Sequence, residues 1–180
     1  SNTDSDGAGL PVTTISGPTT EAGGTATFTV VLTSQPTADV TIGLSSSDAT
    51  EGTVSPTSVT FTSATWATPQ TVTVTGVDDA LDDGDVAYSI VTAAATSSDP
   101  AYSGVNAADV AVSNTDNDSA GITVSAVSGP TTEAGGTATF TVVLTSQPTA
   151  DVTVGLSSSD TTEGTVSPAS VTFTSATWAM

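Results

Sequence analysis

The sequence predicts an all-β protein that is built from tandem β-sandwich repeats. Apolar residues alternate with threonines over short segments, which is the period of a strand with one buried face. Clusters of Gly, Pro, Asp and Ser separate these segments, and no stretch has a helical period of useful length. The first 68 residues also recur at an offset of 112 positions, which is typical of a repeat architecture.

The repeat sets the expected domain boundaries. When the first 68 residues are aligned with residues 113–180, 57 of the 68 positions are identical. Recent tandem duplication is the simplest cause. We therefore expect a tail of a preceding repeat at 1–8, one complete β-sandwich repeat at 9–118, and the N-terminal part of the next repeat, about four strands, at 119–180.

Seven segments of the complete repeat are predicted as strands. They are an opening strand at 12–16, followed by 25–33, 40–44, 59–62, 71–75, 86–90 and 110–112. In the second segment, Phe28 and Val30 face one way, whereas Thr27 and Thr29 face the other. Seven short strands in a repeat of this length, with turns between them, are typical of an immunoglobulin-like β-sandwich.

Two aromatic residues of the repeat lie in predicted turns or loops. Trp66 follows the fourth predicted strand, and Tyr102 lies in the long loop before the last one. Either could be a platform for stacking a sugar ring. We favour a role as aromatic plugs of the core, because only one Trp occurs per repeat.

The composition excludes several function classes. The chain has no Lys, Arg, His or Cys, and its 19 carboxylates give a formal charge of −19. Without basic residues, nucleic acid and anionic membranes are not expected partners. Without His and Cys, zinc and haem sites and the common nucleophilic triads are absent. No apolar run reaches the length of a membrane span, so we expect no membrane insertion.

The carboxylates cluster in the segments after the first, third, fifth and seventh predicted strands. These residues are Glu21; Asp48 and Glu51; Asp78, Asp79, Asp82, Asp83 and Asp85; and Asp116 and Asp118. In a seven-strand antiparallel sandwich these four segments share one end, so the carboxylates should converge. The opposite end carries only Asp39, Asp99 and Asp109.

Convergent carboxylates with no Lys or Arg to balance them favour a bound cation. Like charges that lie close together repel and raise one another's pKa. A hard divalent cation with oxygen ligands relieves this repulsion, and calcium tolerates irregular Asp-rich loops better than magnesium does. The alternative is a solvated acidic surface that aids solubility. We favour calcium for the clustered end and the solvated surface for scattered residues such as Asp39.

These motifs resemble the Calx-β domain, which occurs in sodium–calcium exchangers, in integrin β4 and in long arrays of large bacterial surface proteins. The resemblance rests on the acidic turn after the first strand, TVTVTGVDDALDDGD at 71–85 and NTDND at 114–118. It implies that calcium is held by Glu21, Asp48, Asp78, Asp79, Asp116 and Asp118. The loop reads DDALDDGD instead of an unbroken acidic triplet followed by glutamates, so the resemblance assigns no role to Asp82, Asp83 or Asp85.

The function expected from the sequence is structural and not enzymatic. We expect a calcium-stiffened repeat of a bacterial extracellular stalk, adhesin or fibre at the cell surface, with neighbouring repeats or other copies of itself as partners. The alternatives are a glycan- or protein-binding module that acts by avidity and a calcium sensor. An enzyme is disfavoured because these short strands and loops contain no insertion that would form a cleft.

The second copy raises a packing problem. Residues 122–180 have no counterpart of 69–118, which supply the last three predicted strands of the first copy. Apolar residues that face inward in a complete sandwich would then face water, at a cost that scales with their area. We expect that either a longer chain or a neighbouring molecule completes this fold.

Overall fold

A computed structural model describes residues 7–180, and they form two compact units. The first unit comprises residues up to 79 together with 84–117, and the second comprises 80–83 and 118–180. The predicted tail of a preceding repeat falls mostly on residues 1–6, which lie outside the described residues. Within 7–180, no helix is long and apolar enough to cross a membrane.

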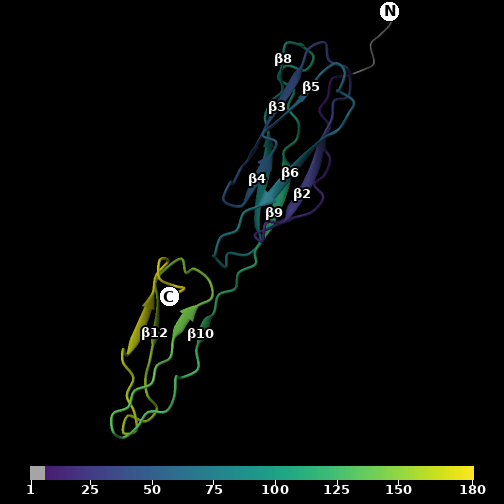
Figure 1. Cartoon of the computed structure of the whole chain (residues 1–180). Helices are drawn as coiled ribbons and strands as arrows, with labels where there is room; N and C mark the ends of the chain where they lie inside the picture. The colour runs from purple at the N-terminus through teal and green to yellow at the C-terminus, as the bar shows by residue number, and fades with distance from the viewer. Residues whose placement is uncertain (1–6) are drawn as a thin grey trace, which may run out of the picture. The chain divides into compact units, whose positions relative to one another are not determined.

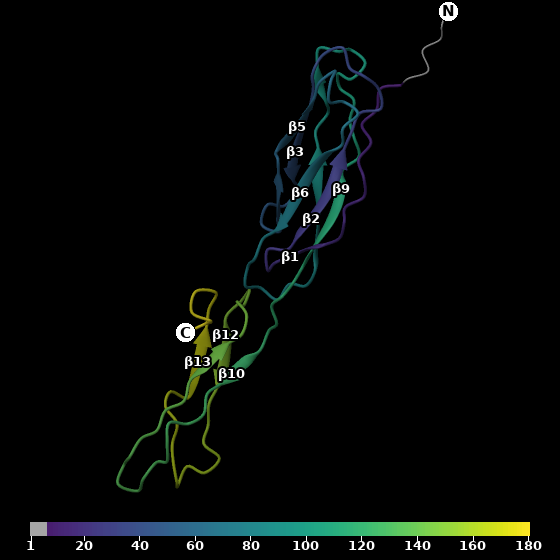
Figure 2. The same ribbon diagram turned by 45° about the vertical axis from the view of Figure 1, so that its right-hand side comes forward.

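The first unit is a β-sandwich, which confirms the coarse prediction of an all-β fold (Figures 1 and 2). Its larger sheet has the order β1-β9-β7-β3-β5, and β8 also pairs with β3. The bounds are β1 (Thr19–Thr20), β3 (Val40–Ser46), β5 (Ser58–Phe61), β7 (Val86–Thr92), β8 (Thr96–Ser97) and β9 (Val110–Thr115). The smaller sheet has the order β2-β6-β4, with β2 (Thr25–Val30), β4 (Gly52–Ser55) and β6 (Gln70–Gly76).

The core lies between the two sheets and is made by the predicted inward rows. Phe28 pairs with Val72 across β2 and β6, and both are almost completely buried. Ile42 and Ile90 cover them from the larger sheet. Threonines occupy the alternate positions, which suits a pleated surface with one exposed face. In the predicted strands that form in the first unit, the alternation in the sequence therefore identified the buried face correctly.

Both aromatic residues that sequence analysis singled out contact this core. Tyr102 is fully buried, and its hydroxyl donates a hydrogen bond to the Ser34 carbonyl oxygen at 2.6 Å. Trp66 is partly buried and packs against the core cluster. Tyr102 is therefore an aromatic plug of the core, as predicted, whereas Trp66 packs against the core and keeps part of its surface exposed.

The prediction of seven strands is corrected, because the first unit contains strands β1 to β9. Residues 12–16 do not form the predicted opening strand, and only Val12 makes an isolated bridge there. The side-chain oxygens of Thr13 and Ser16 accept the backbone N–H groups of Thr29 and Thr27, both at 2.9 Å. These bonds replace part of a regular ladder, as Ser and Thr side chains commonly do. Strand β4 was not predicted, because its sequence resembles the turn around it.

The second unit contains strands β10 to β13, which form two separate antiparallel pairs. Strand β10 (Ile122–Val124) pairs with β11 (Val142–Leu144), and β12 (Val152–Gly155) pairs with β13 (Ser170–Phe173). Its sequence matches the start of the first unit, yet the residues equivalent to β2 and β4 are mostly not in strands.

Candidate metal centre

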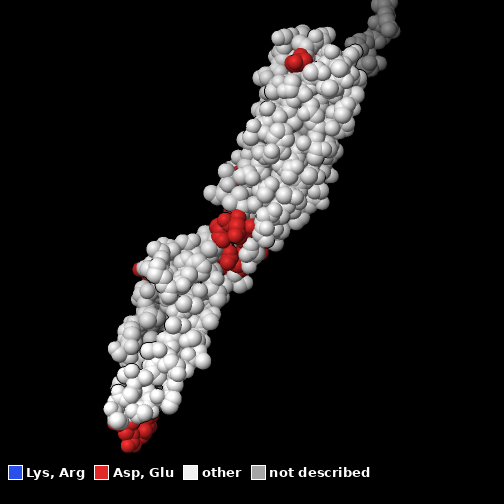
Figure 3. Space-filling model, viewed as in Figure 1, with Lys and Arg blue, Asp and Glu red and all other residues white. Residues whose placement is uncertain are grey.

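Four acidic segments meet at one end of the first unit, and the strand pairing explains why. Strand β1 runs parallel to β9, with Thr20 opposite Thr115. The next residues of the two strands, Glu21 and Asp116, are therefore neighbours, and the Glu21 N–H donates to the Thr115 carbonyl oxygen at 3.1 Å. Figure 3 shows the carboxylates gathered in one patch at this end of the first unit, with no basic residue among them.

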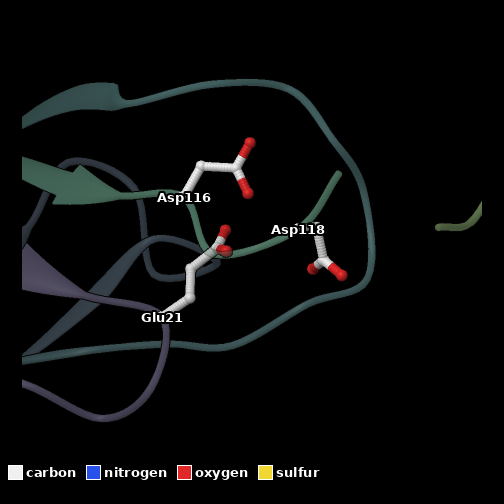
Figure 4. Close-up of side chains that lie close together, drawn as sticks. All are labelled: Glu21, Asp116 and Asp118. Carbon is white, nitrogen blue, oxygen red and sulfur yellow. The ribbon is translucent and has the colours of Figure 1, made fainter. Parts of the chain in front are cut away.

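Glu21, Asp116 and Asp118 form the first group of carboxylates (Figure 4). One oxygen from each lies within 4.8 Å of the others, which is close enough for all three to hold one cation. Glu21 is only 3% exposed, and its Oε2 accepts the N–H of Asn117 at 3.0 Å. The two aspartates are half-buried.

The environment of Glu21 favours its neutral form when no cation is bound. Burial raises the pKa of the Glu21 carboxyl above its ordinary value of 4.5, and the N–H of Asn117 partly offsets that rise. The negative charges of Asp116 and Asp79 raise the pKa further. A cation at this group would reverse the balance and favour the charged carboxylate.

Glu51, Asp79 and Asp83 form the second group, with their oxygens again within 4.8 Å. Glu51 is buried and lies immediately before β4, whereas the two aspartates are exposed. Asn114 Nδ2 donates to Glu51 Oε2 at 3.4 Å. Each group thus combines one buried glutamate with two more accessible aspartates.

A network of buried polar side chains in the sandwich supports both carboxylate groups. Thr19 and Asn114 are almost completely buried, and the Thr19 hydroxyl donates to Asn114 Oδ1 at 3.0 Å. Asn114 Nδ2 also donates to the carbonyl oxygen of Val77 at 3.0 Å, which anchors the start of the acidic loop. The Tyr88 hydroxyl lies 3.0 Å from Thr19 Oγ1. Because buried polar groups with satisfied hydrogen bonds rigidify a structure, this network fixes the loops that carry the carboxylates.

The remaining loop aspartates accept hydrogen bonds within the acidic segments. Asp78 Oδ1 accepts Asn117 Nδ2 at 3.2 Å, and Asp85 Oδ1 accepts the N–H of Asp116 at 3.2 Å. Asp82 Oδ2 accepts the N–H of Ala120 at 2.7 Å. These aspartates tie the 77–85 loop to the segment that follows β9.

Four of the six residues assigned by resemblance lie in the two groups, namely Glu21, Asp116, Asp118 and Asp79. Asp78 and Asp48 lie in neither. Asp48 Oδ1 accepts the N–H of Thr50 at 3.0 Å and its hydroxyl at 2.5 Å, and these bonds hold the pKa of Asp48 below its ordinary value.

Glu51 and Asp83 lie in the predicted acidic segments, but neither was among the residues predicted to hold the metal. A signal for Glu51 was present, because Asp48-x-Thr50 is a typical side-chain-bonded turn that uses the carboxylate of Asp48 locally. The other acidic residue of that turn is Glu51, which leaves it as the one to reach the site.

The donors of both groups fit a hard cation. They are exclusively carboxylate oxygens, which divalent calcium and magnesium prefer, and the chain has no thiol or imidazole for a softer metal. In the second unit, Glu133 and Glu163 are the counterparts of Glu21 and Glu51, and both are exposed. The second copy contains no counterpart of residues 69–118, which carry both the last strands of the first unit and most of its acidic residues.

Comparison with known proteins adds little to this picture. No protein-family model matches the chain, and no curated protein matches it. Among solved structures, the chain is similar to SSP-19, an MSP-domain protein like family member of Caenorhabditis elegans, with 16% identity and a TM-score of 0.37. The match covers 57% of this chain and 97% of that one, and a similarity this low carries no argument.

Proposed function

We propose that this chain is a calcium-stiffened structural repeat, of the Calx-β type, in a bacterial extracellular stalk, adhesin or fibre. The observation that carries the proposal is the pair of carboxylate groups in a chain that has no Lys or Arg. Neighbouring repeats, or other copies of the chain, are the partners under this proposal, and no catalytic activity is involved.

Calcium is the cation that suits these donors best. It accepts six to eight oxygens in irregular geometry, and carboxylates can bind it through one oxygen or two. The accessible aspartates leave room for water ligands, while the buried glutamates supply fixed donors. Magnesium requires a near-ideal octahedron and retains several waters, which carboxylates from irregular loops match less well.

Stiffening follows from where the ligands lie in the chain. Glu21 directly follows β1, whereas Asp116 and Asp118 belong to the segment that follows β9 and leads into the next copy of the sequence. A cation shared by these residues would tie that segment to the sandwich. Without a cation, their mutual repulsion would drive the segment away from Glu21.

A glycan-binding module that acts by avidity is the second candidate, and the aromatic residues that sequence reasoning considered for it do not favour it. Tyr88 and Tyr102 are buried, and Trp66 packs against the core. The near-identical repeats would serve avidity, but they serve a spacer equally well.

Calcium binding is tested by thermal unfolding of the 180-residue chain in chelator and in excess calcium. A ligand that binds only the folded state stabilises it by about 2.7 kcal/mol at a hundred times its Kd. The Asp116→Asn and Asp118→Asn double variant should lose most of this gain, whereas the control Asp39→Asn, at an exposed residue outside both groups, should keep it. Equal midpoints with and without calcium for the unmodified chain would contradict the proposal.

A further inference from the structure

One edge of β9 in the first unit is open over most of its length. In the part of the chain that the structure describes, β9 pairs with β7 along one edge and with the two-residue strand β1 along the other. On the β1 side, the carbonyl oxygen of Thr115 accepts the N–H of Glu21 at 3.1 Å. The carbonyl oxygen of Ser113 accepts the Thr19 hydroxyl at 3.3 Å. Backbone groups point to the same edge at every second residue of a strand, so those of Ala111 face this edge beyond the end of β1.

The segment before β1 is bonded to the smaller sheet and does not continue along β9. The N–H groups of Thr13 and Ser16 donate to carbonyl oxygens of β2 at 3.0 and 2.9 Å. Two adjoining pockets of about 340 and 390 Å³ lie between this segment and β9, and together we call them the β9 groove. Its lining is mostly apolar and includes Val12, Ile15, Val110, Ala111 and Val112. All of these residues belong to the complete repeat, so the ends of the chain do not create the groove.

The charge in the groove comes from a carboxylate. Among the described residues that line it, only Asp109, directly before β9, is charged. Its Oδ1 accepts the N–H and the hydroxyl of Thr92, at 2.9 and 3.2 Å. Both bonds use the same oxygen and the residue is exposed, so Oδ2 is accessible to a cationic group. Because the chain has no Lys or Arg, a basic partner for Asp109 has to come from another molecule.

We propose that the β9 groove binds an extended, basic segment of a different protein, which adds as a strand to the edge at Ala111. Main-chain hydrogen bonds give such strand addition its affinity, and side chains at alternate positions give it specificity. Apolar residues of the segment fill the groove beside Ile15, and a Lys or Arg at its end pairs with Asp109. A second copy of this chain is disfavoured as the occupant, because it brings 19 further carboxylates and no basic residue.

The test uses a synthetic nine-residue peptide with blocked ends, KTVTVTVTK, and the acidic control peptide ETVTVTVTE. Amide hydrogen exchange of the 180-residue chain is followed with each peptide at the same free concentration. At a hundred times the Kd of the basic peptide, exchange at Ala111 and Ser113 should slow about 100-fold. The acidic peptide should leave it unchanged. No protection of these two amides, or equal protection by both peptides, would overturn the proposal.

Two variants of the chain locate the binding site. Ala111→Pro removes an N–H that faces the groove, and an edge strand tolerates proline where its N–H faces outward. This variant should fold and should lose peptide binding. Asp109→Asn keeps Oδ1 for Thr92 and should weaken binding of the basic peptide about threefold at low salt, as loss of an exposed ion pair does. Asp39→Asn, at an exposed residue outside the groove, is the matched control and should bind as the unmodified chain does.

Other outcomes of these experiments would contradict the proposal. Peptide binding that persists in Ala111→Pro, or that is equal in Asp109→Asn and Asp39→Asn, would place the peptide elsewhere. A chain that dimerises through β9 and binds neither peptide would assign the edge to a second copy. Binding should be the same in calcium and in chelator at matched ionic strength, because Asp109 belongs to neither carboxylate group. Failure of this inference would therefore leave the proposed calcium function intact, and the reverse also holds.

Discussion

At Glu21, burial and neighbouring charge both oppose ionisation. The pKa of Glu21 is higher in the folded chain than its ordinary value of 4.5. Without metal, its contribution to stability is therefore fully present below pH 4.5 and is lost as the pH rises through the folded-state pKa. Asp48 and Asp99 have lowered pKa values and act in the opposite sense, since their contributions are lost as the pH falls.

Glu21→Gln isolates this effect. In chelator, the variant should match the unmodified chain near pH 4 and should become the more stable of the two as the pH rises to 7. In excess calcium at pH 7 the order should reverse, because the variant lacks one charged ligand. Urea unfolding over this pH range measures both differences, with Asp39→Asn as the control. A variant that is less stable than the unmodified chain in chelator at pH 7 would show that the folded chain does not disfavour the ionised form of Glu21.

At the scale of the elements, the end of β6 packs closely against residues that support the candidate metal centre. A Cβ at Gly76 would collide with the carbonyl oxygen of Thr20 and with Asn114 Oδ1. Gly76→Ala should therefore cost about 1–3 kcal/mol, as overpacking does, and should weaken calcium binding because Asn114 anchors the acidic loop. Gly43→Ala is the matched control, since its Cβ would make only an ordinary 3.5 Å contact. Equal effects of the two substitutions on unfolding and on calcium titration would contradict this reasoning.

The same elements show what a sequence can and cannot predict. The alternation at 25–30 identified Phe28 and Val30 as core, and the structure confirms this. Residues 137–142 have the same sequence, yet only Val142 of them belongs to a strand, because no strand equivalent to β6 lies beside them. Local pattern therefore predicts which side chains face inward, whereas the existence of the strand depends on its partner.

The residues of the candidate site were likewise predictable from the sequence only in part. Strand order and loop position placed Glu21 and Asp116 at one end, and the structure brings them together. The preference for Glu51 over Asp48 depends on side-chain direction within a single turn, where Thr50 engages Asp48. Sequence position alone does not determine that direction.

At the scale of the whole molecule, the formal charge of −19 means that the carboxylates repel one another. The proposed cation would have a mechanical role because it would cancel this repulsion at the first group. The segment 116–118 follows β9 and carries two of the three carboxylates of the first group. Ionic strength alone weakens repulsion between exposed charges, so any specific effect of calcium has to be measured at constant ionic strength. At constant ionic strength, any stiffening caused by a bound cation should remain. The effect of charge screening should be the same in calcium and in chelator, so it cancels in the comparison.

Small-angle scattering of the 180-residue chain provides this measurement. Replacing chelator by calcium at matched ionic strength should narrow the distribution of interatomic distances, because the segment after β9 becomes fixed to Glu21. The Asp116→Asn and Asp118→Asn double variant should show no such narrowing, whereas Asp39→Asn should behave as the unmodified chain does. If calorimetry detects bound calcium while the distance distribution stays unchanged, the metal stabilises the sandwich without stiffening the connection between repeats, and the mechanical half of the proposal fails.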